Sequence, residues 1–357
     1  MDLQSGPLLA LCVLLAIAAP AVCLVLWNRL TGPRLVRVAE RLGLIILCQV
    51  TVLALAGLLV NHTFQLFPSW SDLTGTDKVN GQVKQASGTP PKEVRPGPAF
   101  TFDKSNGLFG ATVDGQRSGI RSTIRVWLPP QYDLPQYANM RFPVIELFPG
   151  FPGTPTTWFG PMQGAAKLLE TMKAGQAKPY ILVAPVITVE PGRDTECTDI
   201  PHGPQVATWL TADVREAVIG RFRALPGSES WGAMGYSTGG FCAAKLTEQF
   251  PNLFSAGISL AGYFDPSSPD ITRDPVLTAA NSPLALLASG PQVSLLLAGS
   301  SADSNTVDAI NAMVKAARPP TKVFTYIVQN GGHNVRVWQE MLPQAYDWMS
   351  RQLIGPV

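Results

Sequence analysis

The sequence GYSTGGFC, residues 235–242, decides the fold. The short apolar run WGAMG (231–235) leads into it, and FCAAKLTEQF (241–250), which has helical spacing, follows. A glycine-rich turn between a buried strand and a helix is the arrangement of a nucleophile elbow, which places the serine at the helix N-terminus. Free backbone N–H groups and the helix dipole favour developing negative charge there. Ser237 is therefore a candidate nucleophile, and the alternative is a small residue in an ordinary turn.

Strand-like and helix-like segments alternate around this turn. We expect strands at 121–129, 142–148, 180–187, 231–235, 256–262, 293–299 and 322–328, and helices at 162–174, 208–222, 241–250, 304–317 and 334–353. This alternation predicts an α/β fold with a doubly wound, mostly parallel sheet, and the elbow makes it an α/β-hydrolase. Sites in such sheets form at the carboxyl ends of the strands.

A serine hydroxyl needs a general base, and the chain has three histidines. His62 abuts the second apolar N-terminal segment, and His202 precedes the serine in the chain. The α/β-hydrolase order is nucleophile, acid, base, so His333, which follows the last expected strand, is the candidate base. The alternative for His333 is a histidine in a turn or at a helix cap.

The acid is expected just after the strand at 293–299. Asp303 is the first carboxylate there, and it would orient the imidazole and stabilise the imidazolium. Asp308 is the reserve candidate, inside the expected helix. The alternative for Asp303 is an N-cap of that helix.

An oxyanion hole in this fold combines the N–H after the nucleophile with one from the loop after an earlier strand. The first donor would be Thr238, and the second would lie in PGFPG (149–153). The two prolines of this loop have no N–H, and of the other three residues we predict Phe151. A plain Pro-Gly turn is the alternative.

Two N-terminal segments, 7–27 and 42–60, contain no charged side chain. Each is long enough to cross a hydrocarbon core of about 30 Å as a helix, and neither shows the polar stripe of a soluble helix. We therefore predict a transmembrane hairpin. One span followed by an interfacial segment is the alternative.

The segment between the two apolar stretches carries arginines at positions 29, 34, 37 and 41 against a single acid, Glu40. No Lys or Arg follows the second stretch until Lys78. Arginine-rich short loops stay in the cytoplasm, so we expect a multi-pass membrane protein whose later part is extracytoplasmic.

The remaining composition divides the chain into three parts. Residues 1–66 hold the hairpin, 67–108 are rich in Pro, Gly, Ser, Thr and Lys and are expected to form an extracytoplasmic linker, and 109–357 hold the α/β domain. The formal net charge is +2, and no basic cluster is interleaved with aromatic residues, so no nucleic-acid partner is expected.

Four blocks of the sequence resemble the putative esterase family, which includes esterase D and the secreted actinobacterial mycolyltransferases. These blocks are VWLPPQYD, the PGFPG loop, GYSTGGFCAAKL and GGHNVRVWQEMLPQAYDWM, within about 120–353. The resemblance implies serine acyl-ester chemistry without a metal or organic cofactor, as in the membrane-anchored actinobacterial members. It places Ser237, Asp303 and His333 on the nucleophile, acid and base, and Phe151 and Thr238 on the oxyanion donors.

The sequence departs from the family pattern at two places. Esterases often carry His-Gly at Pro149-Gly150, and mycolyltransferases carry a longer polar loop there and a glutamate as the acid. These differences favour an esterase acting on a small-molecule or lipid acyl ester. The alternatives are an acyltransferase that moves the acyl group to a sugar or lipid hydroxyl, and a non-catalytic envelope scaffold.

The five cysteines lie in the N-terminal hairpin and in the α/β domain. Cys12, Cys23 and Cys48 lie in the apolar segments and are interpreted as inert packing residues. An even pair outside the membrane, Cys197 and Cys242, predicts a disulfide; two unpaired buried thiols are the alternative.

Two loops of the α/β domain are candidates to shape the site. Asp194, Glu196 and Asp199 either line its entrance or solvate a long loop. The stretch at 264–283 is interpreted as an excursion that shapes the substrate site.

Overall fold

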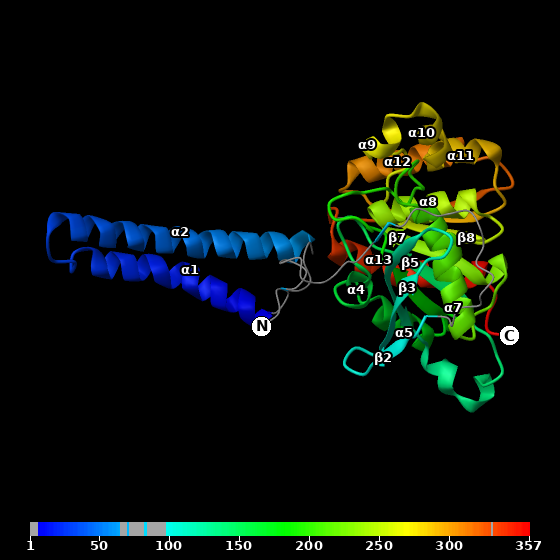
Figure 1. The fold of residues 1–357 in the computed structure, drawn as a ribbon, viewed down its shortest axis with the longest axis horizontal. Helices are drawn as coiled ribbons and strands as arrows, with labels where there is room; N and C mark the ends of the chain where they lie inside the picture. Colours follow the sequence, from blue (N-terminus) through cyan, green and yellow to red (C-terminus); the bar gives the residue numbers. More distant parts are fainter. Residues whose placement is uncertain (1–5, 65–69, 71–81, 84–97, 330) are drawn as a thin grey trace. The chain divides into compact units, whose positions relative to one another are not determined.

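The computed structural model describes residues 6–64, 70, 82–83, 98–329 and 331–357. The chain forms two compact units, residues 1–78 and 79–357 (Figure 1). Large apolar side chains are mostly exposed in the first unit and mostly buried in the second.

The first unit is a hairpin of α1 (Gly6–Trp27) and α2 (Arg34–Phe64). Both helices are long and apolar enough to cross a membrane, although a signal sequence passes the same test. Only 6% of the most apolar window of each helix is buried, which distinguishes them from the core helices of a soluble protein. Their large side chains, such as Leu24 and Leu53, are largely exposed.

The second helix begins earlier than the sequence suggested. We expected its span to start at residue 42, but α2 includes Arg34, Arg37 and Arg41 in its first turns. Arg41 donates a hydrogen bond to the Trp27 carbonyl at 3.2 Å, and its guanidinium lies 4.8 Å from the Trp27 ring centroid. This pair joins the two helices at their connecting turn.

In the described part of the second unit, ten strands form one sheet in the order β10-β9-β8-β7-β5-β6-β4-β3-β2, with β1 paired to β4. The strands are β1 (Gln82–Val83), β2 (Thr101–Asp103), β3 (Leu108–Asp114), β4 (Ile120–Trp127), β5 (Val144–Phe148), β6 (Ile181–Pro185), β7 (Trp231–Tyr236), β8 (Ala256–Leu260), β9 (Ser294–Ser300) and β10 (Lys322–Val328). Pairing is parallel from β6 through β5 and β7 to β10, and antiparallel among β1, β2, β3, β4 and β6. The predicted mostly parallel α/β sheet is confirmed.

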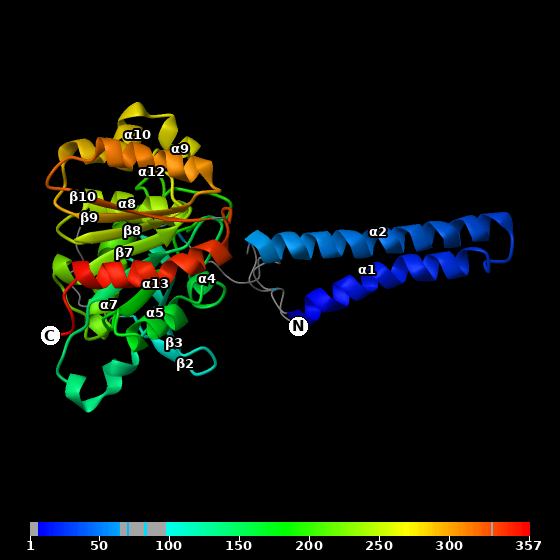
Figure 2. The same cartoon turned by 180° about the vertical axis from the view of Figure 1, so that it is seen from behind.

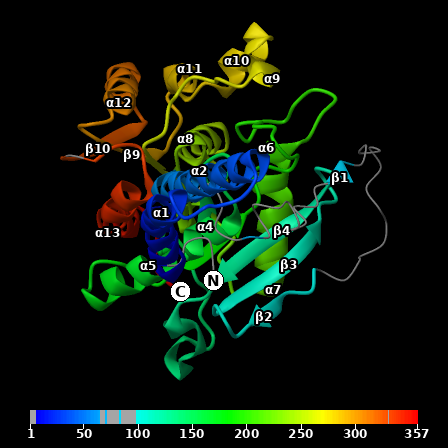
Figure 3. The same cartoon turned by 90° about the vertical axis from the view of Figure 1, so that its left-hand side faces the viewer.

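Helices cover both faces of this sheet (Figures 2 and 3). They are α4 (Pro155–Phe159), α5 (Gly164–Lys173), α6 (Val206–Thr208), α7 (Arg215–Arg221), α8 (Thr238–Gln249), α9 (Pro269–Thr272), α10 (Pro275–Asn281), α11 (Pro283–Leu286), α12 (Ser304–Ala316) and α13 (Val335–Gln352). Helices α5 and α13 pack on one face, through side chains such as Leu168 and Met341. On the other face α7, α8 and α12 pack through side chains such as Val218, Leu246 and Ile310.

Two local features differ from the sequence prediction. The expected helix at 208–222 is interrupted by a π-helical segment, Trp209–Val214, in which the Trp209 indole N–H donates to the Val186 carbonyl at 3.0 Å. In addition, β1 and β2 lie within the expected linker, and β3 begins one residue before the expected domain start at residue 109. The α/β unit therefore reaches further toward the N-terminus than its composition indicated.

Candidate active site

Ser237 lies at the turn between β7 and α8, as the elbow pattern predicted. Its φ of 55° and ψ of −124° are rarely adopted by a residue with a side chain, and such a conformation costs about 1–3 kcal/mol. Two hydrogen bonds hold it: the Ser237 N–H donates to the Leu260 carbonyl at 2.9 Å, and the Phe241 N–H donates to the Ser237 carbonyl at 3.1 Å. The turn thus holds the serine at the end of β7.

The glycines on either side of Ser237 are required by backbone contacts. A Cβ on Gly235 would lie 1.9 Å from the Gly239 carbonyl oxygen, and a Cβ on Gly239 would lie 2.1 Å from the Phe148 carbonyl oxygen. At these glycines the backbone of α8 therefore lies in direct contact with the backbones of β7 and of the end of β5.

The structure brings the three predicted catalytic residues together. The His333 Nε2 lies 3.0 Å from the Ser237 Oγ, and the His333 Nδ1 lies 2.9 Å from the Asp303 Oδ2. The three residues follow β7, β9 and β10, so they meet at the carboxyl ends of parallel strands. In this arrangement the imidazole can take the serine proton at Nε2 while the Nδ1–H donates to the carboxylate.

The imidazole is positioned by its surroundings as well as by these hydrogen bonds. The His333 ring meets the Trp338 ring edge to face at a centroid distance of 5.0 Å, and Trp338 stacks on Tyr236 at 4.6 Å. The His333 side chain is still 44% exposed, so small molecules reach it from solvent.

Asp303 is both a partner of the imidazole and a helix cap. It precedes α12 and accepts hydrogen bonds from the Thr306 N–H at 3.4 Å and the Thr306 hydroxyl at 2.8 Å. Burial opposes its ionisation, but hydrogen bonds from His333 and Thr306 outweigh burial and lower the pKa of the carboxyl. Asp303 is therefore held as a carboxylate against the imidazole.

The other candidates for base and acid lie elsewhere. His202 is exposed in a turn with a φ of 58°, and Asp308 lies within α12 without a hydrogen bond to His333. The side chain of His62 falls outside the described residues.

The loop after β5 lies beside the nucleophile. A Cβ on Gly150 would be 3.2 Å from the Ser237 Cβ. The Gly153 N–H donates to the Gly150 carbonyl at 2.6 Å and is therefore not free for a substrate. Among the described residues the N–H groups of Phe151 and Thr238 have no backbone acceptor, which is consistent with the predicted oxyanion donors.

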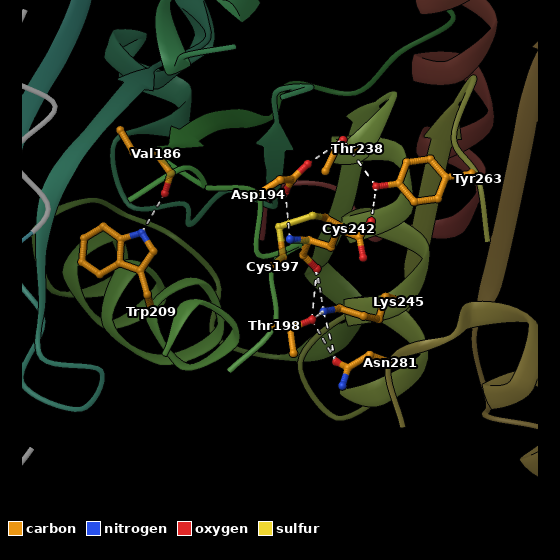
Figure 4. The surroundings of a disulfide bond; sticks show 11 residues. Val186, Asp194, Cys197, Thr198, Trp209, Thr238, Cys242, Lys245, Tyr263 and Asn281 are labelled. Atoms are coloured by element: carbon orange, nitrogen blue, oxygen red, sulfur yellow. Dashed lines mark hydrogen bonds between the residues drawn. A yellow bond between two sulfur atoms is a disulfide. The ribbon is translucent and has the colours of Figure 1, made fainter. Parts of the chain in front are cut away.

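Cys197 and Cys242 form the predicted disulfide, with their Cα atoms 5.7 Å apart (Figure 4). The bond joins the loop after β6 to α8, five residues after Ser237. Cys12, Cys23 and Cys48 are free.

We expect replacement of both Cys197 and Cys242 by alanine to lower the free energy of unfolding by about 4 kcal/mol, because the bond closes a loop of 45 residues. Guanidinium unfolding of the full chain in detergent, followed by tryptophan fluorescence, measures the change. Cys48→Ala is the matched control and should leave the midpoint unchanged. An unchanged midpoint in the double variant would contradict the prediction.

The acidic residues near Cys197 do not solvate their loop, contrary to one of the two interpretations of the sequence. The Glu196 carboxylate is buried and accepts hydrogen bonds from the Tyr263 hydroxyl at 2.7 Å and the Ser267 hydroxyl at 2.6 Å. Asp199 accepts hydrogen bonds from the Thr208 N–H and hydroxyl. These carboxylates are internal anchors of the loop.

Lys245 is a residue of this region that the sequence did not reveal. It is fully buried on α8, and its Nζ donates to the Glu196 carbonyl at 2.7 Å and the Thr198 hydroxyl at 2.7 Å. Burial lowers the pKa of Lys245 to about 7, against the opposing effect of neighbouring carboxylates. The only signal in the sequence was a lysine within the otherwise apolar FCAAKL.

The stretch at 264–283 forms α9 and α10, each of which begins at a proline (Figure 1). Asp274 caps α10 by accepting from the N–H groups of Val276 and Leu277. Its interpretation as a segment that shapes the substrate site stays a prediction.

Comparison with known proteins shows which structures share this fold. An S-formylglutathione hydrolase from Agrobacterium tumefaciens is 14% identical with a TM-score of 0.60, covering 71% of this chain and 99% of its own. A ferulic acid esterase is 18% identical with a TM-score of 0.58, covering 69% and 98%. Mycobacterium tuberculosis MPT51 is 14% identical with a TM-score of 0.50, covering 68% and 97%. At these identities the likeness shows the fold alone.

Sequence comparison gives one curated relative and a family. An uncharacterized protein of Corynebacterium glutamicum is 24% identical over 271 residues, which are 69% of this chain, and the match spans 61% of the length of that relative. The model of the family described as Putative esterase matches residues 115–349 and so includes the elbow, Asp303 and His333. The chain therefore belongs to the putative esterase family.

Proposed function

We propose that the chain is a membrane-anchored serine esterase, with its catalytic unit outside the cytoplasm, that cleaves acyl esters through an acyl-enzyme on Ser237. The observation that carries this proposal is the continuous hydrogen-bonded series of Ser237, His333 and Asp303 in a chain of the esterase family.

The chemistry follows from the two hydrogen bonds of the imidazole. The His333 Nε2 takes the hydroxyl proton as the Ser237 Oγ attacks the acyl carbonyl carbon, and the N–H groups of Thr238 and Phe151 stabilise the oxyanion. Collapse of the tetrahedral intermediate breaks the ester C–O bond, and His333 returns the proton to the leaving alcohol. Water then attacks the acyl-enzyme with His333 as base, which releases the acid and regenerates the serine. Asp303 remains ionised throughout and orients the ring.

Transfer of the acyl group is the second candidate, because a 44% exposed imidazole can activate an acceptor hydroxyl as well as water. The two reactions share the acyl-enzyme and differ only in what resolves it. Adding glycerol or trehalose to an ester assay separates them: an esterase gives only the free acid, whereas a transferase gives the new ester in proportion to the acceptor.

Labelling of the full chain in detergent with a fluorophosphonate, followed by peptide mass mapping, tests the nucleophile directly. The proposal expects one labelled residue, Ser237, and turnover of short-chain p-nitrophenyl esters by the same sample. A folded protein that neither labels nor turns over would favour a scaffold instead.

Three observations support the membrane placement. The apolar helices α1 and α2 are exposed rather than buried, and the four arginines of this unit lie at or near the turn between them. The Cys197–Cys242 disulfide fits an oxidising compartment. Together with the preference of arginine-rich loops for the cytoplasm, these features support an extracytoplasmic catalytic unit.

Single cysteines introduced at exposed positions report this topology. We expect Lys104→Cys to react with a membrane-impermeant maleimide in intact cells, and Thr31→Cys, in the turn between the helices, to react only after permeabilisation. Both positions are exposed in the structure, so access depends on the side of the membrane. The unmodified chain measures the background from its free cysteines, and the reversed pattern would overturn the placement.

A further inference from the structure

We infer that Asp194 is a positioning residue for the reaction, which orders Thr238 and thereby the N–H that follows the nucleophile. The inference rests on the proposed function, because it concerns the oxyanion donor of that same site. It starts from a contact between two residues that are 44 positions apart in the chain.

The contact is a hydrogen bond from the Thr238 hydroxyl to the Asp194 Oδ2 at 3.1 Å (Figure 4). The other carboxylate oxygen, Oδ1, accepts from the Glu196 N–H at 2.8 Å, so both oxygens of Asp194 are used. Thr238 is only 6% exposed and is the first residue of α8. The bond therefore fixes the side chain of the residue whose N–H faces the substrate in the proposed mechanism.

The loop that carries Asp194 is fastened to the same helix as Thr238. The Cys197–Cys242 disulfide and the hydrogen bond from Lys245 to the Glu196 carbonyl attach the loop to α8, five and eight residues after the nucleophile. These two attachments hold Asp194 at a fixed position relative to the N-terminus of α8.

The same loop is anchored on its other side by the segment after β8. The Glu196 carboxylate accepts from the Tyr263 hydroxyl, from the Ser267 hydroxyl and N–H, and from the Ser268 N–H at 3.2 Å. Glu196 and Cys197 have φ values of 48° and 54°, which are unfavourable for residues with side chains. The anchors on both sides stabilise a loop conformation that local preferences oppose.

The position of the Thr238 N–H matters for catalysis because an oxyanion donor must lie about 2.7–3.1 Å from the developing charge. Thr238 follows a serine in a strained conformation, and its own N–H has no backbone partner within the described residues to hold it. The Thr238 hydroxyl supplies that restraint through its bond to Asp194 at 3.1 Å, which is shorter than its contact with the Tyr263 hydroxyl at 3.5 Å. Since the donor acts on the tetrahedral state more than on the bound ester, its misplacement lowers kcat more than it raises KM.

Kinetics of p-nitrophenyl acetate hydrolysis by the full chain in detergent test the inference with matched variants. We expect Asp194→Ala and Thr238→Val each to lower kcat about tenfold with KM nearly unchanged, a fraction of the 10²–10³-fold loss typical of removing a donor. Thr238→Ser keeps the hydroxyl and should stay within about twofold of the wild type. The double variant Asp194→Ala/Thr238→Val should also lose about tenfold rather than a hundredfold, because either change removes the same contact. Asp114→Ala, which removes an exposed carboxylate, is the control.

The outcomes separate this inference from the function on which it rests. If the wild type labels at Ser237 but Thr238→Val keeps full kcat, the inference is wrong and the esterase stands. If Thr238→Ser is as impaired as Thr238→Val, the hydroxyl is not the cause and the inference is also wrong. A wild type that does not label contradicts the proposed function itself. Should Asp194→Ala fail to fold, the comparison of Thr238→Val with Thr238→Ser decides alone.

Discussion

Replacement of Ser237 by alanine is expected to lower kcat for a short-chain p-nitrophenyl ester by about 10⁴- to 10⁶-fold and to abolish fluorophosphonate labelling. Alanine has no Oγ, so no acyl-enzyme forms, and only the oxyanion donors and substrate binding remain to accelerate attack by water. The loss should be of this size because every step of the proposed reaction passes through the serine oxygen.

The alanine variant should remain folded, which makes its activity interpretable. Alanine must adopt the same φ of 55° as the serine, so the strain of the turn is unchanged. The Ser237 N–H and carbonyl bonds are main-chain bonds and are also kept. Ser289→Ala, an exposed serine far along the chain, is the matched control. Residual turnover within about tenfold of the wild type would show that another residue is the nucleophile.

Replacement of Asp303 by asparagine is expected to lower kcat by about 10⁴-fold without lowering stability, the effect known for the acid of a serine protease triad. Asparagine offers no negative charge to the Nδ1–H, so the imidazolium is not stabilised and the ring is free to take the wrong tautomer. It remains one of the best N-cap residues, so its oxygen can still accept from the Thr306 N–H of α12.

Asp303→Ala separates the two roles of this carboxylate. It should lose activity like the asparagine variant and in addition lose about 1 kcal/mol of stability with the cap. Asp308→Asn, five residues along and inside the same helix, is the control and should retain activity. If Asp308→Asn were the inactive variant, the acid would have to be reassigned.

The parallel half of the sheet and the candidate catalytic residues could be predicted because both follow from local pattern. Strands β5 to β9 are almost entirely buried. Ser237, Asp303 and His333 follow β7, β9 and β10 in the order that the fold requires. The disulfide was predictable for a similar reason, since only two cysteines lie outside the apolar segments.

The parts that the sequence did not reveal depend on contacts between distant segments. Strand β2 is three residues long and mostly exposed, so its hydrophobic pattern is too weak to distinguish it from a linker. The anchoring of Glu196 and Asp194 requires left-handed backbone at Glu196 and Cys197, which no residue type there favours. In this loop the disulfide and Lys245 outweigh local backbone preference. Cys242 and Lys245 lie more than forty residues along the chain from the loop residues that they hold.

The backbone contacts of Gly235 and Gly239 show that the two glycines of the elbow motif are required by the fold, independently of the nucleophile. A Cβ at either position would collide with main-chain atoms of α8 or β5, whatever the chemistry at Ser237. A descendant of this chain that kept its fold without the proposed activity would therefore still need both glycines, while its serine could be replaced by a residue that tolerates the φ of 55°. In surveys of related sequences, the glycines report that the architecture persists, and the serine alone reports that the protein can still form an acyl-enzyme.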